Sequence, residues 1–164
     1  MIGFPRTINE KAARTVAGVV AVTGLVALLV PAHWLVIPLA YGFWARVLTG
    51  PRLSPLAALA SRVVAPRLGE PREVPGPPKR FAQGMGAVMT LTAALLALGF
   101  DQRVAAYAVL GLVIVAATLE SVFGYCVGCK VFAGLMRLGL IPASVCADCA
   151  DITRRSNRMR PTTA

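Results

Sequence analysis

The longest uncharged segment of the chain constrains its fold most. Thr15 to Ala45 contains no Asp, Glu, Lys or Arg and is mostly apolar. About 20 such residues suffice for a helix to cross the hydrocarbon core of a bilayer. Because Pro31 and Pro38 interrupt the segment, it predicts two membrane helices, about residues 12–30 and 32–48, in a tight hairpin. The second arm is short, so a tilted or partly re-entrant helix also fits. The apolar core of a cleavable signal peptide is much shorter than this segment. We therefore expect the first span to remain in the mature protein.

The composition agrees with membrane insertion. Of the 164 residues, 57% are apolar and 15% are charged, and the mean hydropathy is +0.69, well above an ordinary soluble chain. The formal net charge of +10 could suggest a nucleic-acid partner. The basic residues, however, are gathered between the apolar segments, which is typical of membrane topology signals. We therefore expect a lipid bilayer partner and no nucleic acid.

Two further apolar segments follow in the second half of the chain. Phe81 to Phe100 carries no charge, and the next segment, about 102–123, carries a single acid, Glu120. With the first hairpin, these segments predict an all-α polytopic membrane helix bundle with four transmembrane helices. We expect a single membrane domain over residues 1–164.

The loop between the two hairpins, residues 49–80, is rich in proline and basic residues. Ser54 and Pro55 form a good N-cap and first-turn pair. Apolar residues at helical spacing follow, so the loop predicts a short amphipathic helix that lies on the membrane surface until Pro66 disturbs it. The prolines after it predict an extended linker up to the third span, about 81–100.

The distribution of positive charge predicts the orientation. With four spans, the N-terminus, the loop 49–80 and the tail 124–164 share one side. Together with Arg14 and Arg46 at the adjoining ends of the spans, this side holds 16 of the 17 Lys and Arg residues. By the positive-inside rule this side is cytoplasmic. The chain is therefore expected in a bacterial inner (plasma) membrane, with both termini in the cytoplasm. At this boundary we expect Arg14 and Arg46 to snorkel to water, and Lys79 and Arg80 to contact lipid phosphates.

Four cysteines follow the last span, and the chain has no others. Cys126 and Cys129 lie in the stretch "GYCVGCK", and Cys146 and Cys149 lie in "CADC". Two Cys-x2-Cys pairs separated by sixteen residues are typical of a four-thiolate Zn(II) site. The segment between the pairs is apolar and helix-like, however, unlike the polar turns of most zinc knuckles.

A thiol redox interpretation uses the same residues and requires no cofactor. A cysteine at a helix N-terminus has a lowered pKa and becomes the better nucleophile, so Cys126 or Cys129 would attack. Asp148 disfavours a thiolate in the second pair, so Cys146 and Cys149 would resolve or relay. Glu120 could accept a proton if a bend after the helix brings it to the cysteines. Stable structural disulfides are not expected in a reducing cytoplasm.

Three segments resemble a family of bacterial four-span membrane proteins known as a domain of unknown function. They are "GPRLSPLAALASRVVAPRL", "GPPKRFAQGMGAV" and "LESVFGYCVGCKVF", and the resemblance covers most of residues 5–140. It implies a four-helix membrane fold, functional weight on Glu120, Cys126 and Cys129, and association with thioredoxin-like and sulfurtransferase proteins. The architecture is also similar to that of quinone-linked thiol oxidases, whose active cysteines face the opposite side of the membrane.

The sequence thus leads to two functional hypotheses and leaves open whether the chain is an enzyme. In the first, Cys126 and Cys129 take part in thiol-disulfide or sulfur-transfer chemistry with a thioredoxin-like or sulfurtransferase partner. In the second, the chain is a non-enzymatic membrane scaffold whose four cysteines hold a structural zinc ion. A transporter is less favoured, because no span carries a charge near its middle.

Overall fold

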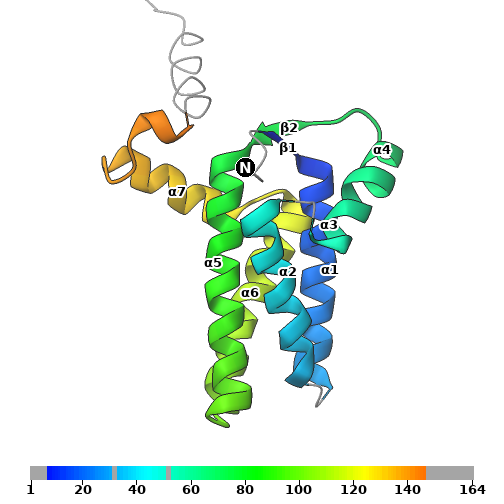
Figure 1. Cartoon of the computed structure of the whole chain (residues 1–164), viewed down its shortest axis with the longest axis vertical. Helices are drawn as coiled ribbons and strands as arrows, with labels where there is room; N and C mark the ends of the chain where they lie inside the picture. The colour runs from blue at the N-terminus through cyan, green and yellow to red at the C-terminus, as the bar shows by residue number, and fades with distance from the viewer. Residues whose placement is uncertain (1–6, 31–32, 51–52, 147–164) are drawn as a thin grey trace, which may run out of the picture.

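The computed structural model describes residues 7–30, 33–50 and 53–146, and their main feature is a bundle of apolar helices (Figure 1). The bundle consists of α1 (Glu10–Leu29), α2 (Val36–Thr49), α5 (Gly76–Ala94) and α6 (Arg103–Phe123). A short 3-10 turn, η1 (His33–Leu35), precedes α2, and a π-helical turn, η3 (Leu95–Gly99), extends α5. The prediction of an all-helical bundle is confirmed.

Three of these helices are long and apolar enough to cross a membrane: Glu10–Leu29, Gly76–Gly99 and Arg103–Phe123. The helix α2 has 14 residues. At about 1.5 Å per residue it is roughly 21 Å long, shorter than the hydrocarbon core of about 30 Å. The described residues therefore include three candidate spans and one shorter apolar helix, and the second arm is as short as the sequence indicated.

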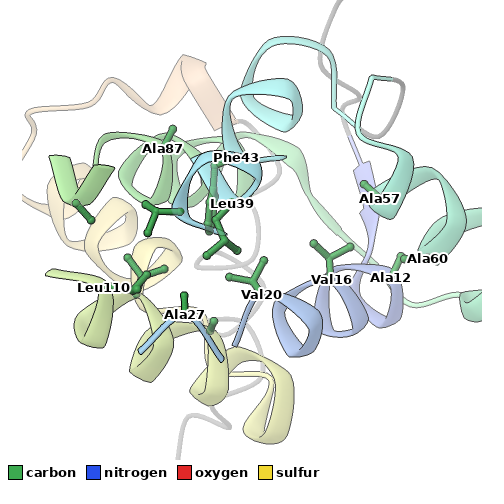
Figure 2. Close-up of a cluster of buried hydrophobic side chains, with 14 of the residues drawn as sticks. Ala12, Val16, Val20, Ala27, Leu39, Phe43, Ala57, Ala60, Ala87 and Leu110 are labelled. Carbon is green, nitrogen blue, oxygen red and sulfur yellow. The ribbon is translucent and has the colours of Figure 1, made fainter. Parts of the chain in front are cut away.

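The bundle is held by two long pairings, α1 with α6 and α2 with α5, and by α5 against α6. Side chains such as Val20, Leu39, Phe43 and Leu110 meet in its interior (Figure 2). Glycine permits the closest approach, because a Cβ at Gly86 would lie 2.3 Å from the Phe43 ring. Many large apolar side chains instead point outward and remain exposed, which suits a surface that faces lipid.

The loop between the hairpins contains three short helical segments: α3 (Pro55–Leu59), the π-helical η2 (Ala60–Val64) and α4 (Ala65–Arg67). The predicted N-cap is confirmed, since the Ala57 N–H donates to Ser54 Oγ at 3.4 Å. The predicted disturbance at Pro66 is present, since the turn before the proline is π-helical and the helix ends at Arg67. The π-helical turn rearranges the hydrogen bonds where the N–H that proline lacks would otherwise be needed.

The prediction of an extended linker after Pro66 is wrong in part. Residues Glu73–Pro75 form a strand, β2, that pairs antiparallel with β1 (Thr7–Asn9), with Ile8 opposite Val74. The helix α5 then begins at Gly76, earlier than the predicted residue 81, because Pro77 and Pro78 fit a first helical turn, where no N–H partner is needed. The strand pair, α3 to α4 and the start of α5 lie at one end of the bundle (Figure 1).

Candidate functional site

The last turn of α6 leads directly into the first cysteine pair through a glycine. Gly124 has a φ of 67°. Its N–H donates to the Glu120 carbonyl at 3.0 Å, and the Tyr125 N–H donates to the Leu119 carbonyl at 3.1 Å. The first of these bonds is that of an αL helix end, which favours glycine because a side chain would strain the left-handed backbone. The chain turns here, so the bend needed to bring Glu120 towards the cysteines is present.

A short helix, α7 (Val127–Arg137), follows the bend and carries the pair. Cys126 is its N-cap residue, and Cys129 lies in its first turn. The helix packs on α5 without a gap, since a Cβ at Gly128 would lie 2.5 Å from the Ala82 Cβ. The Phe132 and Phe81 rings, with centroids 5.6 Å apart, extend this contact. The cysteine pair is therefore fixed against the start of α5.

The two cysteines are reduced and in contact. Neither forms a disulfide; Cys126 is buried and Cys129 is half-buried. A hydrogen bond from the Cys129 thiol lowers the pKa of Cys126, and Lys79 supports this, while burial and Glu120 oppose it. The same hydrogen bond raises the pKa of Cys129, and burial adds to the effect. The pair thus favours a thiolate on Cys126 and a thiol on Cys129, as expected for an attacking and a resolving cysteine.

Glu120 lies beside this pair and is bound to a lysine from another helix. Lys79, in the first turn of α5, forms an ion pair with the Glu120 carboxylate, and Lys79 is only 7% exposed. The expectation that Lys79 contacts lipid phosphates is therefore wrong. Because α5 starts at Gly76, Lys79 is part of the helix and faces α6 instead of preceding a span at Phe81. No motif in the sequence indicated this pairing, which joins residues 41 positions apart.

Two arginines have different positions from the ones predicted. Arg46 is 6% exposed. Its Nε donates to Gln83 Oε1 at 2.8 Å, and its guanidinium lies 4.6 Å from the Phe43 ring centroid. It therefore does not snorkel, because it lies on the face of α2 that packs against α5. Arg14 donates to the Ser121 and Val122 carbonyls at 3.0 and 2.7 Å, and so caps the C-terminal end of α6.

A cavity of about 350 Å³ connects these groups with the interior of the bundle. Its walls are mostly apolar and come from α1, α2, α5 and α6. Its polar lining consists of Arg46, Gln83 and Glu120, and Cys126 borders it as well. Glu120 and Cys126 thus share one cavity, although their spacing would separate them on a continuous helix.

The second cysteine pair is described only in part. Cys146 is buried at the end of η4 (Ala143–Cys146), a 3-10 turn that contacts α5, and Cys149 lies outside the described residues. Within residues 7–30, 33–50 and 53–146, no three His, Cys, Asp or Glu side chains gather as a metal site would require. A role of the second pair in relay or in zinc binding therefore stays a prediction.

The comparison with protein families identifies most of the chain. Residues 8–137 match the family described as Domain of unknown function (DUF4395). The chain belongs to the DUF4395 family. The matched region runs from β1 to the end of α7, so the DUF4395 domain includes Lys79, Glu120, Cys126 and Cys129, whereas Cys146 and Cys149 follow it. The resemblance to a domain-of-unknown-function family is confirmed. No curated protein and no solved structure matches the chain.

Proposed function

We propose that this DUF4395 protein is a four-helix protein of the bacterial inner membrane with its cysteine end in the cytoplasm. Three long apolar helices support insertion, and α2 returns the chain from the far end of the bundle to the end that carries β2 and α7 (Figure 1). The loop between α2 and α5 and the tail after α6 hold most of the basic residues. This distribution favours the cytoplasm for that end.

We propose that Cys126 and Cys129 exchange thiol, disulfide or persulfide equivalents with a cytoplasmic thioredoxin-like or sulfurtransferase protein. The observation that carries this proposal is the hydrogen-bonded dithiol at the start of α7, beside a buried lysine and glutamate. Inert cysteines need neither a hydrogen bond between their sulfurs nor a lysine that favours the thiolate. A thiolate next to a resolving thiol is the arrangement that exchange chemistry uses.

The exchange has two balanced steps. The Cys126 thiolate attacks one sulfur of a partner disulfide, and the partner's other sulfur leaves as a thiolate. The Cys129 thiol then loses its proton and attacks Cys126 in the mixed disulfide, which releases the second partner sulfur. The partner gains two electrons, and Cys126 with Cys129 becomes a disulfide. In this scheme Glu120 accepts the Cys129 proton. Cys146 and Cys149, when reduced, would return the first pair to the dithiol by the same exchange and become a disulfide themselves, which a cytoplasmic dithiol reductant would then reduce.

A trapping experiment with the full chain in native membranes tests this function. Removal of the resolving thiol in Cys129→Ser should leave the mixed disulfide unresolved, so a partner adduct accumulates on Cys126. The adduct should disappear on reduction and be absent from Cys126→Ser and from the double variant. Equal adduct levels in all three variants, or none in Cys129→Ser, would exclude Cys126 as the attacking group.

A further inference from the structure

A second and smaller cavity of about 60 Å³ lies where α1, α2, η2 and α5 meet. Its charged and hydrogen-bonding side chains are Arg46, Ser61, Lys79 and Gln83, and the rest of its lining is apolar or glycine. No carboxylate borders it among the described residues. The volume suits a small group, since drug-sized ligands need pockets of about 300–1,000 Å³.

The charge around this cavity is not balanced. Lys79 is neutralised by Glu120, but both partners that Arg46 contacts are neutral, the Gln83 side chain and the Phe43 ring. Within the described part of the chain, none of the salt bridges includes Arg46. Two buried cations therefore accompany one buried acid. Glu120 also attracts Arg46 electrostatically, but one carboxylate cannot neutralise both Arg46 and Lys79. Excess buried positive charge is costly, so this site favours an anion.

The donors around the cavity fit one kind of anion. A guanidinium presents several N–H donors in a planar fork that matches two oxygens of one group. Because Gln83 Oε1 already accepts from Arg46, its side-chain NH2 is the end that can donate to a ligand. The Ser61 hydroxyl and the Lys79 ammonium line the same space. Such a set of donors recognises several oxygens on one centre, as in sulfate or phosphate.

We propose that this cavity binds an oxyanion group of the sulfate or phosphate type, with Arg46 as its principal ligand. The oxyanion comes either from a small solute or from the head group of an anionic lipid. The lining residues Ile8, Ala57 and Ser61 belong to β1, α3 and η2, and these elements lie at the end of the bundle where the loops meet (Figure 1). The lining does not include either cysteine of the first pair, although Lys79 contributes to both sites. The proposal rests on the cavity and its donors and does not require thiol exchange.

The first test measures anion binding to the full chain in a neutral detergent. Unfolding midpoints are followed with sodium sulfate, phosphate or thiosulfate, against sodium chloride at the same ionic strength. A ligand that binds only the folded state raises the midpoint in a saturable way, whereas general salting-out by sulfate does not saturate. We expect saturable stabilisation that Arg46→Gln weakens at least about tenfold, since charge-assisted hydrogen bonds are lost. Arg62→Gln, a change of an exposed arginine on the neighbouring η2, should leave it intact.

Two further arms separate the possible sources and failures. In nanodiscs, the stability of the protein in phosphatidylglycerol is compared with its stability in phosphatidylcholine. If phosphatidylglycerol stabilises the wild type but not Arg46→Gln, the oxyanion is a lipid phosphate. If Arg46→Gln does not fold, Ser61→Val, which fills the cavity without removing a charge, should weaken the same saturable effect. The proposal is overturned if no oxyanion or anionic lipid acts above chloride, or if Arg46→Gln responds as the wild type does. The double variant of Cys126 and Cys129 should bind anions normally, so failure of the thiol function stays distinguishable.

Discussion

Lys79 in the first turn of α5 pairs with Glu120 in the last turn of α6, next to the Cys126 thiol. The side chains of the pair are 9% and 14% exposed. This contact connects the two helices at the end of the bundle where the cysteine pair lies. The ion pair therefore affects both the stability of this end of the bundle and the charge near the dithiol.

Breaking the ion pair should destabilise the fold more than replacing both partners. Lys79→Met or Glu120→Leu leaves one charge buried without its partner, which costs up to about 3–5 kcal/mol in folding free energy. The double variant Lys79→Met with Glu120→Leu should recover most of this loss, because no unpaired charge remains. Unfolding in mixed micelles measures the four members of this cycle. Asp101→Asn, at the exposed pair with Arg103, is the control and should change little. Additive losses in the double variant would contradict the coupling.

The pH dependence of thiol modification should show a thiolate on Cys126. Its pKa lies below the usual value of about 8.5, so methyl methanethiosulfonate should react with Cys126 at lower pH than with an ordinary cysteine. Cys129→Ala removes the hydrogen bond to the thiolate, and Lys79→Met removes a favourable charge, so both should shift the profile to higher pH. Because the pKa of Cys126 is lower in the folded state than in the unfolded state, ionisation of Cys126 stabilises the fold. This stabilisation is fully present above the unfolded-state pKa and is lost as the pH falls through the folded-state pKa. Mass spectrometry of each cysteine between pH 5 and 10 gives the profile, and unchanged profiles in both variants would contradict this assignment.

The contact of α7 with α5 should depend on the size of residue 128. Gly128→Ala would place a methyl group 2.5 Å from the Ala82 Cβ, so α7 must move away. We expect a loss of about 1–3 kcal/mol in folding free energy, as for other overpacked sites. Gly134→Ala on the same helix meets no atom within 4 Å and should be neutral or stabilising by up to about 1 kcal/mol. The free energy of unfolding and the reactivity of the thiols should both change in Gly128→Ala and not in Gly134→Ala. Equal effects in the two variants would exclude the close contact between α7 and α5.

Zinc analysis separates the two interpretations of the cysteines. If the first pair is a redox dithiol, protein purified under reducing conditions should contain well below one zinc per chain. A chelator should then leave its stability and its Cys126 reactivity unchanged. Elemental analysis with thiol counting measures both quantities. One tightly held zinc per chain, lost in Cys146→Ser, would favour the structural scaffold instead.

Labelling with an impermeant maleimide tests the orientation. In a cysteine-free background, Val104→Cys lies at the start of α6 and Leu68→Cys follows α4, and both native side chains are exposed. We expect Val104→Cys to react in intact spheroplasts and Leu68→Cys to react only after permeabilisation. The reverse pattern would put the cysteine end outside the cytoplasm. Reaction of both from outside would mean that α5, the long helix between the two positions, does not cross the membrane.

The helices could be predicted because their signals are local. Segments of about 20 apolar residues determine where a chain enters lipid, and Ser54 before Pro55 predicts a helix start from neighbouring atoms alone. The predictions failed where distant segments pair. The strand Glu73–Pro75 forms only because Thr7–Asn9 lies beside it, and Lys79 is buried because it pairs with Glu120 on another helix.

The sequence by itself determined that the chain is an apolar helical bundle with a dithiol motif after its last long helix. It also allowed a bend after that helix, which the structure places at Gly124 in the left-handed conformation that glycine adopts without strain. Only the tertiary structure decided what surrounds that motif. Lys79 and Arg46 resembled interfacial anchors, since a sequence does not show which face of a helix meets its neighbour. Packing of α5 against α6 and α2 buries both charges, and burial makes one a partner of Glu120 and the other the centre of a candidate anion site.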